Sequence, residues 1–193
     1  MCRIGAIKSR NFIHPSMALK LMQSQQKGHD NSGFAMVMQD LGGIFEPYKN
    51  LPTLSMACTD DGIKIAEEIL HEAGFNRVMQ WTPDVHDEPG LDINAMPNYV
   101  FETFKYTKTY KNASQKEKEE LLLDTRLKLR AALEPNEEGF AYSFWPDVIT
   151  LKEIGDPRDI GTRTPTTTSF VTPPTLSTCK ATRHWRMAKT PST

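Results

Sequence analysis

Apolar residues recur at intervals of three and four along residues 63–73, which is the spacing of an amphipathic helix. The Thr-Asp-Asp sequence at 59–61 offers oxygens that can cap its N-terminus, and Gly74 suits the left-handed residue that follows a helix. The side chains that share one side of this helix are Ile63, Ala66, Ile69, Leu70 and Ala73. The pattern therefore predicts a core-facing helix that ends before Gly74.

A second helix is predicted after Ser114, because Ser114 and Glu117 have the spacing of a capping box. The side chains that can face a core from this helix are Leu121, Leu122, Thr125, Leu129 and Ala132. Pro135 cannot continue a helix, so we expect the helix to end near Leu133.

Shorter apolar runs predict strands and one further helix. The helix should begin near Pro15, because proline suits a first turn, and should end near Gln26. Gly42-Gly43 predicts a tight turn and therefore a hairpin, whereas the proline-rich residues 82–97 predict a surface loop. Strands are expected at residues 2–7, 33–39, 78–81, 99–106, 139–145 and 148–152.

Composition divides the chain near residue 161. Residues 162–193 contain no acidic residue, but they contain five basic residues, eleven threonines and four prolines. Such a stretch has too few apolar side chains to offset the entropy of ordering, so we expect a disordered, low-complexity tail. A truncation or a shifted reading frame is an alternative origin for it. Residues 1–161 are expected to form the folded domain.

The remaining bulk properties exclude several function classes. The net charge of -1 gives no overall field for nucleic acid or for an anionic membrane. No apolar run approaches the roughly 20 residues of a membrane span, and no signal peptide is recognisable. We therefore expect a cytoplasmic protein without nucleic-acid or membrane partners. Three cysteines without metal-like spacing predict neither a disulfide framework nor a metal site.

The first candidate for chemistry is Cys2, which follows the initiator methionine. Removal of Met1 would place a thiol and a free α-amine on the same residue. An α-amine titrates near a pKa of about 8 and can act as the base for the thiol. The resulting thiolate is a good nucleophile toward amides. The alternative is a chance cysteine at the second position.

The second candidate is the polar segment Gln26–Ala35, which joins the first expected helix to the next strand. Gly28 and Gly33 permit backbone angles that other residues avoid. Between them, the Asp-Asn-Ser sequence at 30–32 can bond to nearby backbone and stiffen the wall of a site. The alternative is an ordinary connection between a helix and a strand.

Together these two segments resemble the opening of class II, N-terminal-nucleophile glutamine amidotransferases. That family opens with Cys-Gly-Ile and carries Arg-Gly-x-Asp-Ser-x-Gly after its first helix. Three longer stretches look like the stand-alone glutamate-synthase-like amidotransferases, namely Met1–Ser9, Gly28–Ala35 and Gly155–Ile160. The resemblance covers residues 1–161.

The resemblance implies an α+β fold, a four-layer αββα sandwich that we expect to be incomplete in this chain. It implies hydrolysis of glutamine to glutamate and ammonia by Cys2, with no cofactor and no metal. The ammonia would pass to a glutamate-synthase-like domain or subunit. The residues implied to bind glutamine are Lys27, Gly28, Asp30, Ser32 and Arg186. Arg186 is included because residues 184–188 resemble the family's His-x-Arg-x-Ala segment.

The chain also departs from the family pattern. Arg3 stands where the family has glycine, Lys27 keeps a positive charge but not the fork of arginine, and Asn31 precedes Ser32. No Asn-Gly pair occurs in the sequence, although the family uses one for its oxyanion hole. Two other hypotheses therefore stay open. One is a truncated and inactive fragment that acts as a binding or structural module, and the other is a plain α/β scaffold.

Exposed strand edges in an incomplete sandwich also predict self-association.

Overall fold

The computed structural model describes residues 4–11, 13, 16–24, 34–81 and 98–153. Its elements, in chain order, are α1 (Ser16–Ser24), β1 (Phe34–Gln39), the 3-10 helix η1 (Gly43–Tyr48), β2 (Pro52–Cys58), α2 (Asp60–Glu72), β3 (Phe75–Trp81), β4 (Asn98–Tyr106), α3 (Lys108–Lys111), α4 (Gln115–Leu133), the 3-10 helix η2 (Glu134–Asn136), β5 (Gly139–Pro146) and β6 (Val148–Glu153).

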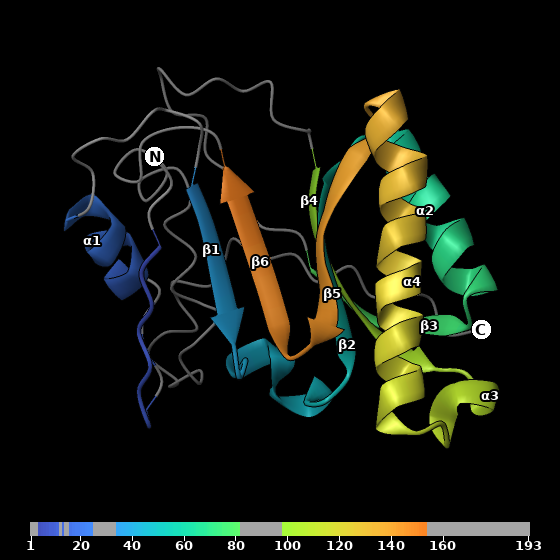
Figure 1. Cartoon of the computed structure of the whole chain (residues 1–193), viewed down its shortest axis with the longest axis horizontal. Helices are drawn as coiled ribbons and strands as arrows, with labels where there is room; N and C mark the ends of the chain where they lie inside the picture. The colour runs from blue at the N-terminus through green and yellow to red at the C-terminus, as the bar shows by residue number, and fades with distance from the viewer. Residues whose placement is uncertain (1–3, 12, 14–15, 25–33, 82–97, 154–193) are drawn as a thin grey trace.

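The described residues form two antiparallel sheets. One contains four strands in the order β3-β4-β2-β5, and the other contains β1 and β6. Figure 1 shows α1, the β1–β6 pair, the four-stranded sheet and the α2–α4 pair in this order across the molecule. The α+β part of the expected fold class is therefore confirmed. The predicted loop at 82–97 and the predicted tail at 162–193 lie outside the described residues.

The four-stranded sheet is packed on both faces. The helix-side cluster, which α2 and α4 cover, consists of Leu54, Met56, Cys58, Ala66, Leu70, Phe75, Val100, Phe104, Leu122, Leu129, Leu133, Ala141 and Phe144. The inter-sheet cluster, which joins the two sheets, consists of Met36, Leu41, Phe45, Ala57, Met79, Trp81, Tyr99, Phe101, Ile149 and Leu151. The core of the protein is therefore two apolar layers with a sheet between them.

The two long helices confirm the predictions made from capping and spacing. The Thr59 side chain caps α2 by accepting a hydrogen bond from the backbone N–H of Gly62 at 3.0 Å. Gly74 follows α2 with a φ of +85°, which few other residues adopt without strain. At the start of α4, Ser114 and Glu117 form the expected capping box. Local signals in the sequence therefore fix both ends of α2 and the start of α4.

The predicted strands at 33–39, 78–81, 99–106, 139–145 and 148–152 are confirmed, since they overlap β1, β3, β4, β5 and β6. The first predicted helix is also confirmed within the described residues, where it spans Ser16–Ser24.

The hairpin expected at Gly42-Gly43 is wrong. The chain forms η1 there instead, and the side chain of Phe45 turns into the inter-sheet cluster. Its ring meets the ring of Trp81 edge-on, with centroids 5.8 Å apart. Burial of this large aromatic side chain favours the 3-10 turn over an exposed hairpin.

The β2 strand was not predicted from the sequence, although it lies between β4 and β5 in the four-stranded sheet. All seven of its residues are buried. Its polar side chains find partners inside the protein. The hydroxyls of Thr53 and Thr103 are 3.1 Å apart, and Ser55 Oγ accepts a hydrogen bond from the backbone N–H of Thr150 at 3.0 Å. A strand with Pro, Thr and Ser among its residues resembles a loop until these partners are known.

The strand expected at 2–7 is wrong for the residues that the structure describes. Residues 4–7 lie in no strand, and the side chain of Ile4 is 91% exposed. A strand is stable only when its N–H and C=O groups pair with a neighbour, and no described strand pairs with this segment. The rigid strand that we expected directly behind Cys2 is therefore not formed at residues 4–7.

Large apolar side chains are exposed on β1, β5 and α4, among them Val37, Phe140, Trp145, Leu123 and Leu127. Val37 is 57% exposed on the outer face of the β1–β6 pair. The predicted self-association stays a prediction, but these side chains are the described surface on which it would depend. Among the described helices, none combines the length and the apolar character needed to cross a lipid bilayer.

Candidate functional site

The residues that the sequence singles out for chemistry all lie outside the described part of the chain. They are Cys2, Lys27, Gly28, Asp30, Ser32 and Arg186. The structure therefore neither brings them together nor separates them. It does describe the elements on either side of the polar segment, which are α1 before it and β1 after it. The prediction that this segment joins a helix to a strand is confirmed.

Both flanking elements are anchored in the inter-sheet cluster. Ala18 and Met22 of α1 pack against this cluster, and Met36 of β1 is buried within it. The helix before residues 25–33 and the strand after them are therefore both held by packed side chains, which is a requirement for a precise site wall.

The pairing of β1 with β6 places the start of β1 beside the end of β6. Phe34 at the start of β1 lies opposite Glu153 at the end of β6. The segment Gly28–Ala35 enters β1 at this point, and Gly155–Ile160 begins two residues after Glu153. Residues far apart in the sequence therefore enter and leave the β1–β6 pair at neighbouring positions.

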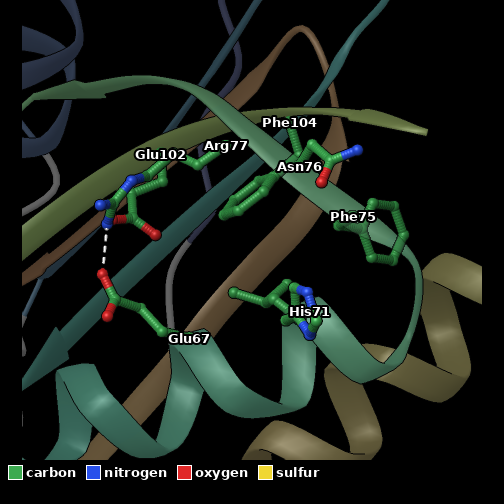
Figure 2. Close-up of a pocket in the computed structure, with 8 residues that line it drawn as sticks. Glu67, His71, Phe75, Asn76, Arg77, Glu102 and Phe104 are labelled. Carbon is green, nitrogen blue, oxygen red and sulfur yellow. Dashed lines mark hydrogen bonds and ion pairs between the residues drawn. The ribbon is translucent and has the colours of Figure 1, made fainter. Parts of the chain in front are cut away.

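A pocket of ≈ 320 Å³ lies on the other side of the four-stranded sheet, between α2, β3 and β4 (Figure 2). Its lining residues are Glu67, Leu70, His71, Phe75, Asn76, Arg77, Glu102 and Phe104. Its volume is at the lower end of the range found for small-molecule sites, and its walls mix apolar and charged side chains.

An ion-pair network forms the polar side of this pocket. Arg77 Nη1 donates to Glu102 Oε1 at 2.8 Å and to Glu67 Oε1 at 2.5 Å. A β-bulge between Arg77 and Met79 interrupts the pairing of β3 with β4 beside this network. A bulge re-aims the side chains next to it, which is consistent with Arg77 reaching both carboxylates.

Glu102 is the unusual member of the network, because its side chain is only 1% exposed. Burial raises the pKa of the Glu102 carboxyl, and the guanidinium of Arg77 offsets only part of this effect. Burial lowers the pKa of Arg77, but its attraction to Glu102 and Glu67 outweighs burial and leaves that pKa raised. Glu102 Oε2 and Arg77 Nε are buried without a hydrogen-bond partner among the described residues.

Sequence reasoning missed this network. A signal was present, because Glu102 is an isolated acidic residue in the otherwise uncharged run Tyr99–Phe104. A charge in a buried strand is rare unless it is paired. The partner could not be named in advance, because Arg77 lies 25 residues earlier and meets Glu102 only through the pairing of β3 with β4.

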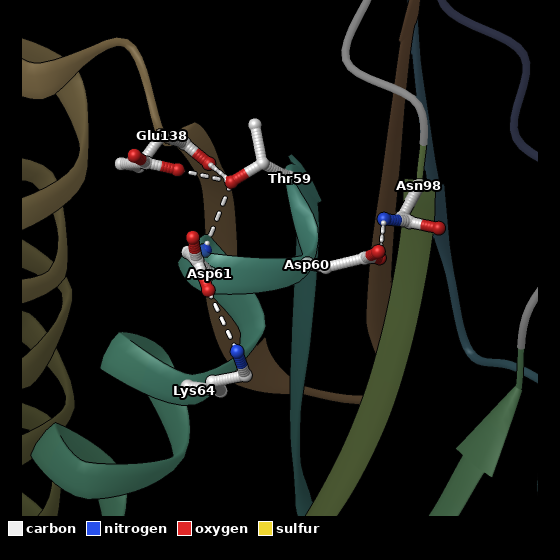
Figure 3. Close-up of polar contacts among 7 residues, drawn as sticks. Thr59, Asp60, Asp61, Lys64, Asn98 and Glu138 are labelled. Carbon is white, nitrogen blue, oxygen red and sulfur yellow. Dashed lines mark hydrogen bonds and ion pairs between the residues drawn. The ribbon is translucent and has the colours of Figure 1, made fainter.

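A second polar cluster, at the N-terminus of α2, is satisfied internally (Figure 3). The Thr59 hydroxyl contacts the Glu138 carboxylate, and the Thr59 backbone N–H donates to the Glu138 carbonyl at 2.9 Å. Asn98 Nδ2 donates to Asp60 Oδ1 at 2.9 Å. These contacts join α2 to the start of β5 and to β4, so we assign them a structural role.

Cys58 lies next to this joint and is fully buried in the helix-side cluster. Burial, with smaller contributions from Glu102 and Asp60, raises the pKa of its thiol to about 12. A thiol with this pKa stays protonated at neutral pH, so Cys58 is a core residue and not a nucleophile. Within the described part of the chain, no group of three or more His, Cys, Asp or Glu side chains could hold a metal ion.

Comparison of the chain with protein-family models, with curated proteins and with solved structures found no match.

Proposed function

We propose that this chain is a glutamine amidotransferase-type domain that hydrolyses glutamine to glutamate and ammonia, with Cys2 as its nucleophile. The observation that carries the proposal is the register of β1 with β6. It brings together the ends from which two family-like segments, Gly28–Ala35 and Gly155–Ile160, depart. A chance similarity gives no reason for the two matching segments to adjoin paired ends of the same two strands.

The order of the layers supports the same proposal. The described part of the chain has a helix, a two-stranded sheet, a four-stranded sheet and a helix pair in this order (Figure 1). This order suits the four-layer αββα sandwich of N-terminal-nucleophile hydrolases. Among the described residues the β1–β6 sheet has two strands, which suits the expectation of an incomplete sandwich.

In the proposed reaction, the thiolate of Cys2 attacks the side-chain amide carbon of glutamine. The C–N bond breaks, and the nitrogen takes up a proton and departs as ammonia. Cys2 and the glutamyl group are then joined as a thioester. Water then cleaves the thioester to release glutamate and restore the thiol. After removal of Met1, the α-amine of Cys2 accepts the thiol proton and returns it to the leaving group. Residues 27, 28, 30, 32 and 186 hold the substrate in this proposal, and a synthase-type partner receives the ammonia.

A second candidate function is an inactive amidotransferase-like module that binds a partner without catalysis. Two observations favour it. The sequence contains no Asn-Gly pair for an oxyanion hole, and loss of one such donor typically lowers the rate by about 100–1,000-fold. In addition, Ile4 is exposed and residues 4–7 form no strand that would hold Cys2 rigidly.

A glutaminase assay on the full chain separates the two candidates. We expect measurable turnover in the unmodified chain and at least a thousandfold lower turnover in Cys2→Ser, because the covalent step requires the thiolate. Cys179→Ser is the matched control, since it removes a thiol that the proposal does not use. Full activity in Cys2→Ser would contradict the nucleophile assignment. A complete absence of turnover in the unmodified chain would favour the inactive module.

A further inference from the structure

The described lining residues of the pocket between α2, β3 and β4 include none of the residues assigned to the proposed glutamine chemistry. It opens on the helix-covered face of the four-stranded sheet, whereas α1 and β1, the elements before and after residues 25–33, pack against the inter-sheet cluster. An inference about this pocket therefore stands independently of the proposed function.

The charges in the pocket leave an excess of negative charge. Arg77 is one cation between the two carboxylates of Glu67 and Glu102, and a single nitrogen, Nη1, bonds to both. The carboxylate of Glu67 is partly exposed, but that of Glu102 is almost completely buried. A buried carboxylate with one unpaired oxygen is costly, and a further hydrogen-bond donor would lower that cost.

Glu102 lines the pocket, and its unpaired oxygen is buried beside it. Figure 2 shows the carboxylate of Glu102 above that of Glu67, with the ring of Phe104 beside it and the ring of Phe75 across the pocket. Glu102 Oε2 has no hydrogen-bond partner among the described residues. Leu70 supplies a further apolar wall from α2. A charged acceptor at one end of an aromatic-walled space is a common arrangement for binding an amine.

We propose that this pocket binds a small organic cation, namely a primary ammonium group attached to a short apolar body. The ammonium group donates to Glu102 Oε2 and approaches the carboxylate of Glu67. The apolar body lies against Phe75, Phe104 and Leu70. An anion is disfavoured, because two carboxylates already neutralise Arg77. A metal ion is disfavoured too, because among the described residues Glu67, Glu102 and His71 of the pocket are not grouped closely enough to hold one.

The test is an NMR titration of the full-length chain with benzylammonium chloride, with benzyl alcohol and sodium benzoate as neutral and anionic analogues of the same shape. We expect saturable shifts of the resonances of Arg77, Glu102 and Phe104 with benzylammonium, and at least tenfold weaker binding of both analogues. Equal binding of benzyl alcohol, tighter binding of benzoate, or no saturable shift with benzylammonium would each overturn the proposal.

A matched pair of variants tests whether the binding of benzylammonium depends on the carboxylate of Glu102. Glu102→Gln keeps the shape of the side chain and an oxygen for Arg77 but loses the charge, so we expect at least tenfold weaker binding of benzylammonium. Glu68→Gln removes an equal charge from the exposed surface of α2 outside the pocket, so its affinity should stay within twofold. Equal affinities in the two variants would overturn the proposal. If Glu102→Gln does not fold, Glu67→Gln replaces it, with weaker binding than Glu68→Gln as the expected result and equal binding as the contrary one.

Discussion

The two faces of the four-stranded sheet are covered in different ways. On one face, α2 and α4 bury the helix-side cluster with side chains at helical spacing, and Leu122, Leu129 and Leu133 of α4 are at most 1% exposed. On the other face, the β1–β6 pair, α1 and η1 together cover the inter-sheet cluster, and Val37 of β1 is 57% exposed. The residues that cover the helix side are brought together by local sequence patterns. The residues of the inter-sheet cluster are brought together by pairings between distant segments.

The largest expected effect tests the helix-covered face. Leu129→Ala removes a side chain that is 0% exposed, and we expect a loss of about 2–5 kcal/mol in the free energy of unfolding. Leu127→Ala, in the same helix, is the matched control, because Leu127 is 52% exposed. It should change that free energy by about 0.5 kcal/mol or less. Urea unfolding measures both variants, and equal losses would show that α4 is not packed as described.

The same contrast explains which elements could be predicted from the sequence. The α2 and α4 helices were predicted with most of their core-facing residues, because a cap and a spacing of three and four lie within one short segment. In α4, however, the buried residue is Leu133 and not the predicted Ala132. The β2 strand was missed, because its Thr53 and Ser55 are satisfied only by Thr103 and Thr150, far away in the chain. The exposed segment at 4–7 was predicted as a strand on apolar content alone, without a known pairing partner.

The candidate functional residues also differ in whether they could be predicted from the sequence. The nucleophile and the polar turn were proposed from short motifs, and the structure confirms only that a helix and a strand flank the turn. The Glu67–Arg77–Glu102 network could not be predicted, because the pairing of β3 with β4 and the packing of α2 create it. A charged residue such as Glu102 in a buried strand shows that a partner must exist, but not which residue it is.

A smaller expected effect concerns Glu102 and the dependence of stability on pH. The pKa of Glu102 is raised in the folded protein above its ordinary value of 4.5, so the neutral carboxyl favours folding. This contribution is complete below the ordinary pKa and is lost as the pH rises through the folded pKa. We therefore expect Glu102→Gln to gain stability relative to the unmodified chain as the pH rises from 4 to 8. Urea unfolding across this range measures the difference, and parallel pH profiles would contradict the assignment.

The most direct test of Cys2 as a glutamine-recognising nucleophile is the intact mass of the full chain after incubation with 6-diazo-5-oxo-L-norleucine, a glutamine-like electrophile. The expected result is a mass that lacks Met1 and carries one adduct, which peptide mapping locates at Cys2. Cys58 should stay unlabelled, because it is buried and its thiol has a pKa of about 12. An unlabelled chain, or an adduct at another cysteine, would contradict the proposed function, and retention of Met1 would exclude the α-amine of Cys2 as the base.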